Sequence, residues 1–320
     1  MTEAECFDSQ VPTRKSMRKA SHLVGILILA SLSSTVSVAA PPTTTDAGMV
    51  FGGQWFEANQ SGTSTVNLSD LSPVVEVYTA TWCSNCVDVE HALDGIENET
   101  GIQQYHIHRA INEGQDPLGS IAVDQRFHDR YGVMAPPVVV FNGSTMKVGS
   151  VTDAASLESE FTGLAQQNTD ISGTSTFGWN MTSNTTGVAT WTLDPGNLGL
   201  PDEGSLVAYA WIVEDSANFE EGTNGLEDYP HVVRGILELG EVNHTANSAP
   251  SSGTSTITLP DAYDGNDLSV HLIYQFNIPA DVDESEDPPL VSTESDRALP
   301  AMSLVTSLGI VLGAALIRRD

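Results

Sequence analysis

The chain has 320 residues, with 42 Asp and Glu against 12 Lys and Arg, and a formal net charge of −30 at pH 7. A surface of that sign repels phosphate backbones, which argues against a nucleic-acid-binding role. Three cysteines are too few for a fold held together by disulfides, whereas 40% hydrophobic residues are enough to build packed cores.

The N-terminal segment 1–40 is typical of a secretory signal peptide. Basic residues within 14–19 precede an apolar run at 23–32, and small residues suited to peptidase cleavage follow. Met17 would begin a shorter leader of the same kind. We therefore predict that the chain beyond a short linker at 41–49 is exported.

In residues 50–167, strand patterns of β-branched and apolar residues alternate with helical patterns. The predicted strands are 74–79, 103–108 and 133–141, and the predicted helices begin near residue 83 and span 117–131 and 154–166. This order of strand and helix predicts an α/β domain.

The first of these strands runs directly into Trp82-Cys83-x-x-Cys86, at the expected start of a helix. A cysteine in that position meets unpaired backbone N–H groups and the positive end of the helix dipole, which stabilise a thiolate. Cys83 comes first and is predicted to attack a substrate sulfur, and Cys86, one turn later, is placed to resolve the mixed disulfide. Cys6 would leave with the leader. A bridge across two residues closes too short a loop to stabilise the fold, so the pair is predicted to be redox-active.

The motif Trp82-Cys83-x-x-Cys86 after a strand, with Pro136 just before a later apolar strand, resembles the thioredoxin superfamily. The resemblance implies a thioredoxin-like fold over residues 50–167 and a redox-active Cys83–Cys86 disulfide. It also implies that Pro136 is a cis proline facing the cysteine pair, and that Pro136 and Trp82 shape the groove that binds a substrate peptide.

The sequence departs from the thioredoxin pattern at one position. Thioredoxins place a buried Asp six residues before the first cysteine, where it assists proton transfer, and this chain has Val77 there. The nearest carboxylate, Glu76, is expected on the opposite face of the strand.

A narrower resemblance covers both halves of the chain. Residues 76–86 resemble the start of the 28-kDa outer-membrane-protein-related family, which joins a thioredoxin-like domain to a C-terminal β-sandwich. Residues 208–215, followed by the His231-x-x-Arg234 strand, resemble that family's second domain.

The second half, residues 171–279, alternates strand patterns with Gly, Asn, Ser and Asp turns. The predicted strands are 174–179, 187–194, 205–214, 230–239, 254–259 and 268–277. Because no long helical pattern interrupts them, they predict an all-β sandwich domain.

The C-terminal segment is typical of a membrane anchor. Residues 280–298 form an acidic stalk rich in Pro and Ser, and residues 299–317 carry no charge. At about 1.5 Å per residue, this run spans a hydrocarbon core of ~30 Å. The tail at 318–320 begins with two arginines, which predict a cytoplasmic end. The sequence thus predicts a single-pass cell-membrane protein whose bulk is extracytoplasmic.

These patterns lead to a hypothesis with two alternatives. The leading hypothesis is a membrane-anchored thiol-disulfide oxidoreductase that acts on protein dithiols or disulfides through Cys83 and Cys86 and needs no cofactor. The first alternative is a non-catalytic cell-surface binding protein on a thioredoxin scaffold. The second is a copper or zinc metallochaperone, in which His106 and His108 would join the two cysteines as ligands.

Overall fold

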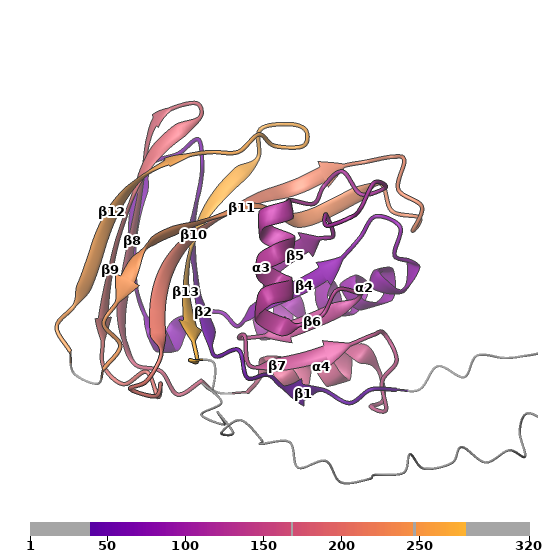
Figure 1. Ribbon diagram of the computed structural model, residues 1–320, viewed down its shortest axis with the longest axis horizontal. Helices are drawn as coiled ribbons and strands as arrows, with labels where there is room; N and C mark the ends of the chain where they lie inside the picture. The colour runs from indigo at the N-terminus through magenta and orange to yellow at the C-terminus, as the bar shows by residue number, and fades with distance from the viewer. Residues whose placement is uncertain (1–38, 168, 246–247, 280–320) are drawn as a thin grey trace, which may run out of the picture. The chain divides into compact units, whose positions relative to one another are not determined.

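The computed structural model describes residues 39–167, 169–245 and 248–279 (Figure 1). The chain divides into two compact units, 1–279 and 280–320, and every described residue belongs to the first. The predicted leader up to residue 38 lies outside the described residues, as do the acidic stalk, the membrane helix and the cytoplasmic tail. Among the described residues, no helix has both the length and the apolar composition that a membrane crossing requires.

Nine strands form one mixed sheet, in which β4 pairs in parallel with β5, β5 pairs in parallel with β11, and all other neighbours are antiparallel. In spatial order the strands are β1 (Thr43–Thr44), β7 (Thr145–Val148), β6 (Val138–Phe141), β4 (Val74–Thr79), β5 (Gln103–His108), β11 (Asp228–Val242), β10 (Ser205–Asn218), β13 (Leu268–Asn277) and β2 (Val50–Glu57).

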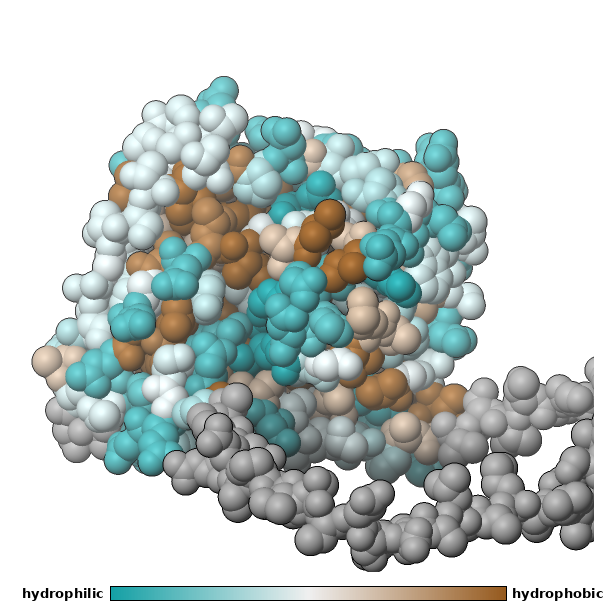
Figure 2. Space-filling model, viewed as in Figure 1, coloured by the Kyte–Doolittle hydropathy of each residue, from teal (hydrophilic) through white to brown (hydrophobic). Residues whose placement is uncertain are grey.

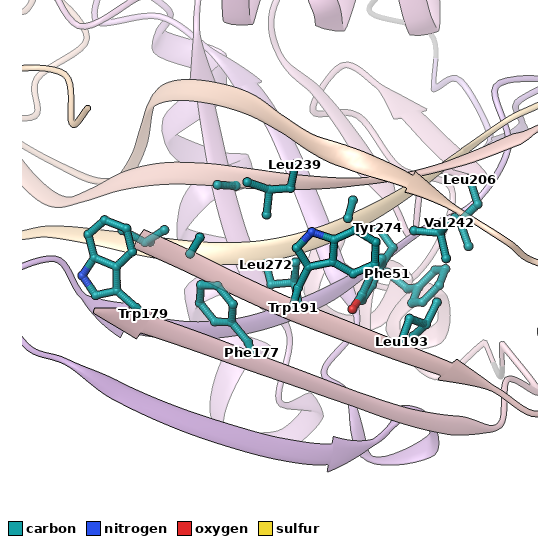
Figure 3. Close-up of a cluster of buried hydrophobic side chains, with 14 of the residues drawn as sticks. Phe51, Phe177, Trp179, Trp191, Leu193, Leu206, Leu239, Val242, Leu272 and Tyr274 are labelled. Atoms are coloured by element: carbon teal, nitrogen blue, oxygen red, sulfur yellow. The ribbon is translucent and has the colours of Figure 1, made fainter. Parts of the chain in front are cut away.

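A second, antiparallel sheet packs over the β2, β13, β10 and β11 end of the first. Its strands are β12 (Ser251–Thr258), β9 (Thr186–Pro195), β8 (Gly173–Ser183) and β3 (Gly62–Asn67). The core between the two sheets is apolar and aromatic, and Trp179 and Trp191 are both buried in it (Figure 3). Apolar residues gather between the sheets on the face seen in Figure 2, where polar and intermediate residues make up most of the rest.

Helices cover both faces of the other end of the large sheet. On one face α2 (Ser84–Thr100) and α4 (Leu157–Ala165) pack on β4 and β6, and on the other α3 (Ile121–Tyr131) packs across β4, β5 and β11 (Figure 1). Both α2 and α3 end at glycines with left-handed backbone, Gly101 and Gly132, whose N–H groups bond the last carbonyls of each helix. A short 3-10 helix, η1 (Leu68–Asp70), follows β3.

The predicted fold class, an α/β thioredoxin-like domain followed by an all-β sandwich, is wrong. The described residues are mostly β, with 44% in strands and 17% in helices, and the strands of both predicted domains share their sheets. From the first half, β2 pairs with β13, β3 pairs with β8, and β5 pairs with β11. The predicted boundary near residue 170 therefore does not separate two sheets. In both sheets, strands that precede this residue pair with strands that follow it, so each covers the other's edge.

Strand β2 was not predicted, and its backbone explains why. Gly52 and Gly53 lie inside the strand with φ of 136° and 96°, where the register against β13 shifts between Leu272 and Ile273. A Cβ at Gly52 would stand 2.4 Å from the Leu272 carbonyl oxygen. The two glycines thus permit a β-bulge, and they also interrupt the alternating pattern by which a strand is recognised.

A buried ion pair fixes α3 to the sheet. The guanidinium of Arg126 contacts the fully buried carboxylate of Glu76, which also accepts a hydrogen bond from Tyr131. The same guanidinium lies over the Trp211 ring, 4.7 Å from its centroid, and donates to the Gln275 side chain at 2.7 and 3.1 Å. One side chain of α3 therefore contacts β4, β10 and β13 at once.

We predict that Glu76→Gln lowers the free energy of unfolding by about 3 kcal/mol, because it leaves the mostly buried charge of Arg126 without its counter-ion. Urea unfolding of the full chain at neutral pH measures the change. Asp129→Asn, which removes an exposed carboxylate from the same helix, is the control and should change the free energy by less than about 0.5 kcal/mol. Equal effects of the two substitutions would contradict the role given to the ion pair.

Candidate functional site

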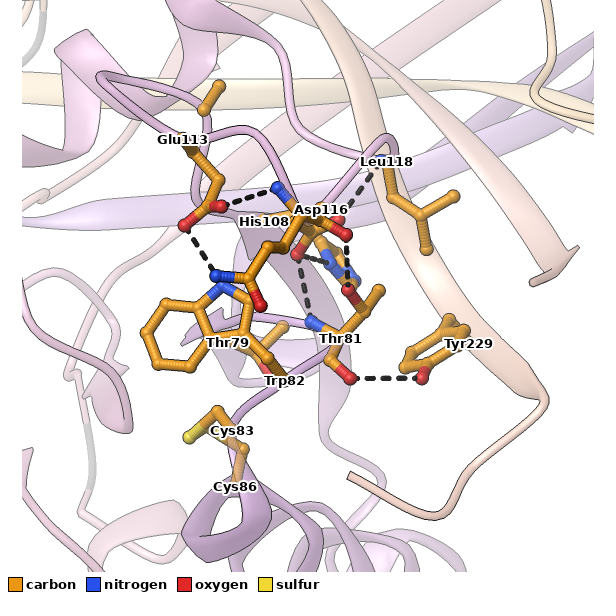
Figure 4. A network of polar contacts seen from close by, with 12 residues as sticks. Thr79, Thr81, Trp82, Cys83, Cys86, His108, Glu113, Asp116, Leu118 and Tyr229 are labelled. Atoms are coloured by element: carbon orange, nitrogen blue, oxygen red, sulfur yellow. Dashed lines mark hydrogen bonds and ion pairs between the residues drawn. A yellow bond between two sulfur atoms is a disulfide. The ribbon is translucent and has the colours of Figure 1, made fainter. Parts of the chain in front are cut away.

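Cys83 and Cys86 are joined in a disulfide at the start of α2 (Figure 4). Cys83 is the N-cap residue, with extended backbone, and its carbonyl accepts the Cys86 N–H at 3.1 Å. No acidic residue lies in the first turn of the helix. Within the helix itself, no carboxylate of the first turn offsets the free N–H groups and the helix dipole, an arrangement that favours a thiolate.

The two sulfurs differ in accessibility. Cys86 is fully buried, whereas Cys83 retains 5% of its surface and packs against Ala80 and Trp82. Cys83 is thus nearly enclosed, although it lies at the start of the helix. Cys83 is nevertheless the cysteine that an incoming sulfur reaches first.

The Trp82 indole is held in place by charged neighbours. Its Nε1 donates to the Glu113 carboxylate at 2.9 Å, and the Arg109 guanidinium lies 6.0 Å from the ring centroid. Desolvation alone would raise the pKa of Glu113, but hydrogen bonds from the backbone of Gln115 and Gly114 and from Trp82, with the charge of Arg109, lower it overall. The ionised Glu113 thus fixes the ring beside the disulfide.

A buried carboxyl group follows Cys86 by one helical turn. Glu90 is 4% exposed, on the same face of α2 as Cys86, and accepts a hydrogen bond from the Thr79 hydroxyl at the end of β4. Burial raises the pKa of Glu90, although the Thr79 hydrogen bond and the charge of His108 work in the opposite direction. The site therefore contains a buried acid, in a different place from the thioredoxin Asp.

A buried pair of His108 and Asp116 supports the loop before the disulfide. His108 Nδ1 lies 2.8 Å from Asp116 Oδ2, and both side chains are fully buried. The same carboxylate accepts the backbone N–H groups of Thr81 and Leu118 at 2.9 and 3.0 Å. Among the described residues, His108 Nε2 is buried and has no hydrogen-bond partner. Asp116 thus orients the imidazole and also fixes the backbone two residues before Cys83.

The turn between β10 and β11 closes over this loop from the other half of the chain. The N–H groups of Thr223 and Asn224 donate to the Thr81 carbonyl at 2.9 and 3.1 Å, and the Tyr229 hydroxyl lies 3.4 Å from it. Desolvation and the charges of Asp116 and Glu90 raise the pKa of Tyr229 to about 12. The cysteine loop is therefore held by residues more than 130 positions away in the sequence.

The predicted proline position is off by one residue. The cis peptide bond joins Pro136 to Pro137, so Pro137, not Pro136, is the cis proline. Val138 pairs with Tyr78, which places the two prolines at the end of the sheet where β4 leads into the cysteine loop. Pro136 is half-buried and Pro137 is buried.

The residues proposed as a metal set are otherwise engaged. The two cysteines are bonded to each other, His108 to Asp116, and His106 Nε2 to the Gln104 side chain at 3.2 Å. In the described part of the chain, no three His, Cys, Asp or Glu side chains meet in an arrangement that could hold a metal ion.

Sequence reasoning missed Glu90, Asp116 and Tyr229. A signal existed for Glu90, because it interrupts the otherwise apolar stripe of α2 that includes Val89 and Leu93. Nothing local marks Asp116 or Tyr229, which reach the cysteine loop through tertiary packing alone. Glu76, as expected, lies on the opposite side of β4 from Val77, which packs with α2 and α4.

Comparison with known proteins adds two remote structural likenesses. No family model and no curated protein matches this sequence. The structure is similar to HBP35 of Porphyromonas gingivalis, with 16% sequence identity, a TM-score of 0.46, and coverage of 72% of this chain and 80% of that one. It is also similar to a structural-genomics target protein from Agrobacterium tumefaciens, with 14% identity, a TM-score of 0.40, and coverage of 71% and 97%. At TM-scores of this size, neither likeness assigns a fold or a function to this chain.

We predict that burial of Glu90 makes stability depend on pH. Its pKa in the folded protein is raised above the ordinary value near 4.5, so between these two values the folded state binds more protons than the unfolded state. The stability of the wild type relative to Glu90→Gln should therefore be highest below about pH 4.5 and fall as the pH rises towards the raised pKa.

Urea unfolding of both proteins, oxidised, from pH 4 to 8 tests this dependence. Glu99→Gln, an exposed substitution on the same helix, is the control and should follow the wild-type curve. If the wild-type and Glu90→Gln curves ran parallel over the whole range, Glu90 would not be the buried acid described above.

Proposed function

We propose that this protein is a membrane-anchored, extracytoplasmic thiol-disulfide oxidoreductase that acts on protein dithiols or disulfides. The observation that supports the proposal best is the disulfide at the start of α2, with Cys83 more accessible than Cys86 and no acidic residue in the first helical turn. A second support is the buried Glu90, one turn after Cys86, because thiol-disulfide exchange needs a proton acceptor or donor near the resolving sulfur.

In this proposal the exchange proceeds through a mixed disulfide. A substrate thiolate attacks Cys83 Sγ, the Cys83–Cys86 bond breaks, and Cys86 leaves as a thiolate that takes up a proton. A second substrate thiolate then attacks its own half of the mixed disulfide, forms the substrate disulfide and releases Cys83 as a thiolate. Two electrons pass from the substrate dithiol to the cysteine pair, and reduction of a substrate disulfide follows the same steps in reverse.

The proposed location rests on the segments outside the described residues. The leader at 1–40 and the uncharged run at 299–317 are the basis for export and for anchoring by a single helix. An acidic stalk between the folded unit and the membrane would give the site access to protein substrates at the cell surface.

We expect Cys83→Ser to abolish disulfide exchange, because no accessible sulfur remains at the helix start. Cys86→Ser should instead accumulate mixed disulfides on Cys83, because the resolving sulfur is absent. Insulin reduction with dithiothreitol measures activity, and non-reducing electrophoresis followed by mass spectrometry measures trapping. Ser84→Ala, which leaves both sulfurs in place, is the control. Both cysteine variants reducing insulin at the wild-type rate would refute the proposal.

We also expect reduced Cys83 to react with iodoacetamide at unusually low pH. The free N–H groups of α2 favour its thiolate, which is the reactive form, so its alkylation rate should reach half of its maximum at a lower pH than that of glutathione. Mass spectrometry of the alkylated peptide gives the rate at each pH, with the Cys86→Ser variant isolating the Cys83 reaction. A profile that matches glutathione would favour a non-catalytic binding protein.

A further inference from the structure

A pocket lies along the large sheet, away from the cysteine loop. Its volume is about 390 Å³, within the range of about 300–1,000 Å³ that is usual for small-molecule pockets. It is lined by the start of β5, by the adjoining parts of β11, β10, β13 and β2, and by the end of α2. None of its lining residues belongs to the cysteine site.

One wall of this pocket is an exposed aromatic ring in a fixed position. Trp55 on β2 is 52% exposed and stacks on His271 of β13, with ring centroids 5.8 Å apart and planes 17° apart. His271 is hydrogen-bonded on both ring nitrogens, to Gln103 and Tyr105 at Nδ1 and to Ser269 at Nε2. Burial and the nearby His231 lower the pKa of His271 to about 3, so the imidazole that supports the indole is uncharged at neutral pH.

Four polar side chains line the same pocket and have no hydrogen-bond partner in the described part of the chain. Glu97 and Asp215 offer acceptor oxygens, and Asn59 and Asn266 offer both donors and acceptors. No Lys or Arg lines the pocket, so an anionic ligand would meet uncompensated carboxylates.

These features together select the class of ligand. The exposed indole is a flat apolar surface, which suits a ligand with an apolar face. The mixture of amides and carboxylates suits a ligand that both donates and accepts hydrogen bonds. A pyranose ring has both properties, with C–H groups on one face and hydroxyls around its edge. An ammonium or guanidinium group could also lie on the indole and pair with the carboxylates, but it only donates, whereas a saccharide hydroxyl also accepts hydrogen bonds from the amide N–H groups of the two asparagines.

We propose that this pocket binds a neutral saccharide, with a pyranose ring stacked on Trp55 and its hydroxyls hydrogen-bonded to Asp215 and the neighbouring amides. The site is independent of the cysteine pair, so it does not rest on the proposed oxidoreductase function. It gives the protein a second binding function, directed at a glycan.

A glycan array that carries neutral, sialylated and sulfated oligosaccharides tests the proposal with the full chain in detergent. We expect the wild type to bind one or more neutral glycans and none of the acidic ones. Calorimetry with the best free oligosaccharide should give an affinity that falls at least about tenfold in Trp55→Ala and in Asp215→Asn. Ile121→Ala, which removes an exposed apolar side chain from α3, should bind as the wild type does.

Circular dichroism of each variant separates a lost contact from a lost fold, and Asp215→Asn keeps the size of the side chain. Cys83→Ser should retain saccharide binding, which distinguishes this site from the cysteine site. The proposal is overturned if no neutral glycan binds, if Trp55→Ala binds as tightly as the wild type, or if choline or arginine binds in a Trp55-dependent manner while saccharides do not.

Discussion

The pairing of β5 with β11 is the contact on which the architecture depends. The two strands are bridged at one position, His106 opposite Val232, and this bridge makes one sheet of strands from both halves of the chain. One bridged position is a weak connection in itself, and side-chain contacts between the two strands and their neighbours add to it. The Tyr105 ring packs edge-on against Trp211 of β10, and Arg234 donates to the Leu118 carbonyl in the loop after β5. These contacts, the first buried and the second partly buried, pack the two strands side by side where each would otherwise present an open edge.

The cysteine loop depends on the same junction. The β10–β11 turn reaches the Thr81 carbonyl only because β11 lies beside β5, and Asp116 reaches the Thr81 N–H from the loop that follows β5. The peptide groups on both sides of Thr81 are thus held by residues brought together through the joined sheet. A loop held in this way is oriented in advance, which would lower the entropic cost of reaching the geometry that the proposed exchange requires.

Local patterns predicted the individual elements well and their assembly poorly. Strands β4, β5 and β13 match their predicted ranges because each is a short run that contains β-branched or aromatic residues, which is a local signal, although nearly every residue in them is buried on both faces. The helix start at Cys83 was also predicted, because a strand running into a polar turn and an apolar stripe is a local signal. These local patterns do not indicate which strands pair with one another. They therefore could not predict that the two halves share their sheets, nor the fold class that follows from it. The bulged strand β2 shows the same limit. Gly52 and Gly53 permit its close pairing with β13, but they interrupt the alternation of apolar residues by which a strand is recognised.

The acids near the cysteines show why burial and partners, not sequence distance, decide chemical roles. Glu76 is the carboxylate closest in sequence to the thioredoxin Asp position. It lies on the α3 side of β4, where its oxygens accept hydrogen bonds from the Arg126 guanidinium and the Tyr131 hydroxyl. Glu90 comes after the cysteines, yet it is buried on the Cys86 face of α2 with a hydroxyl as its hydrogen-bond partner. Burial raises the pKa of Glu90 although the Thr79 hydroxyl works against it, whereas the carboxylate of Glu76 is taken up by its guanidinium and phenol partners. Of the two, Glu90 is therefore the group that could exchange a proton with Cys86 in the proposed reaction.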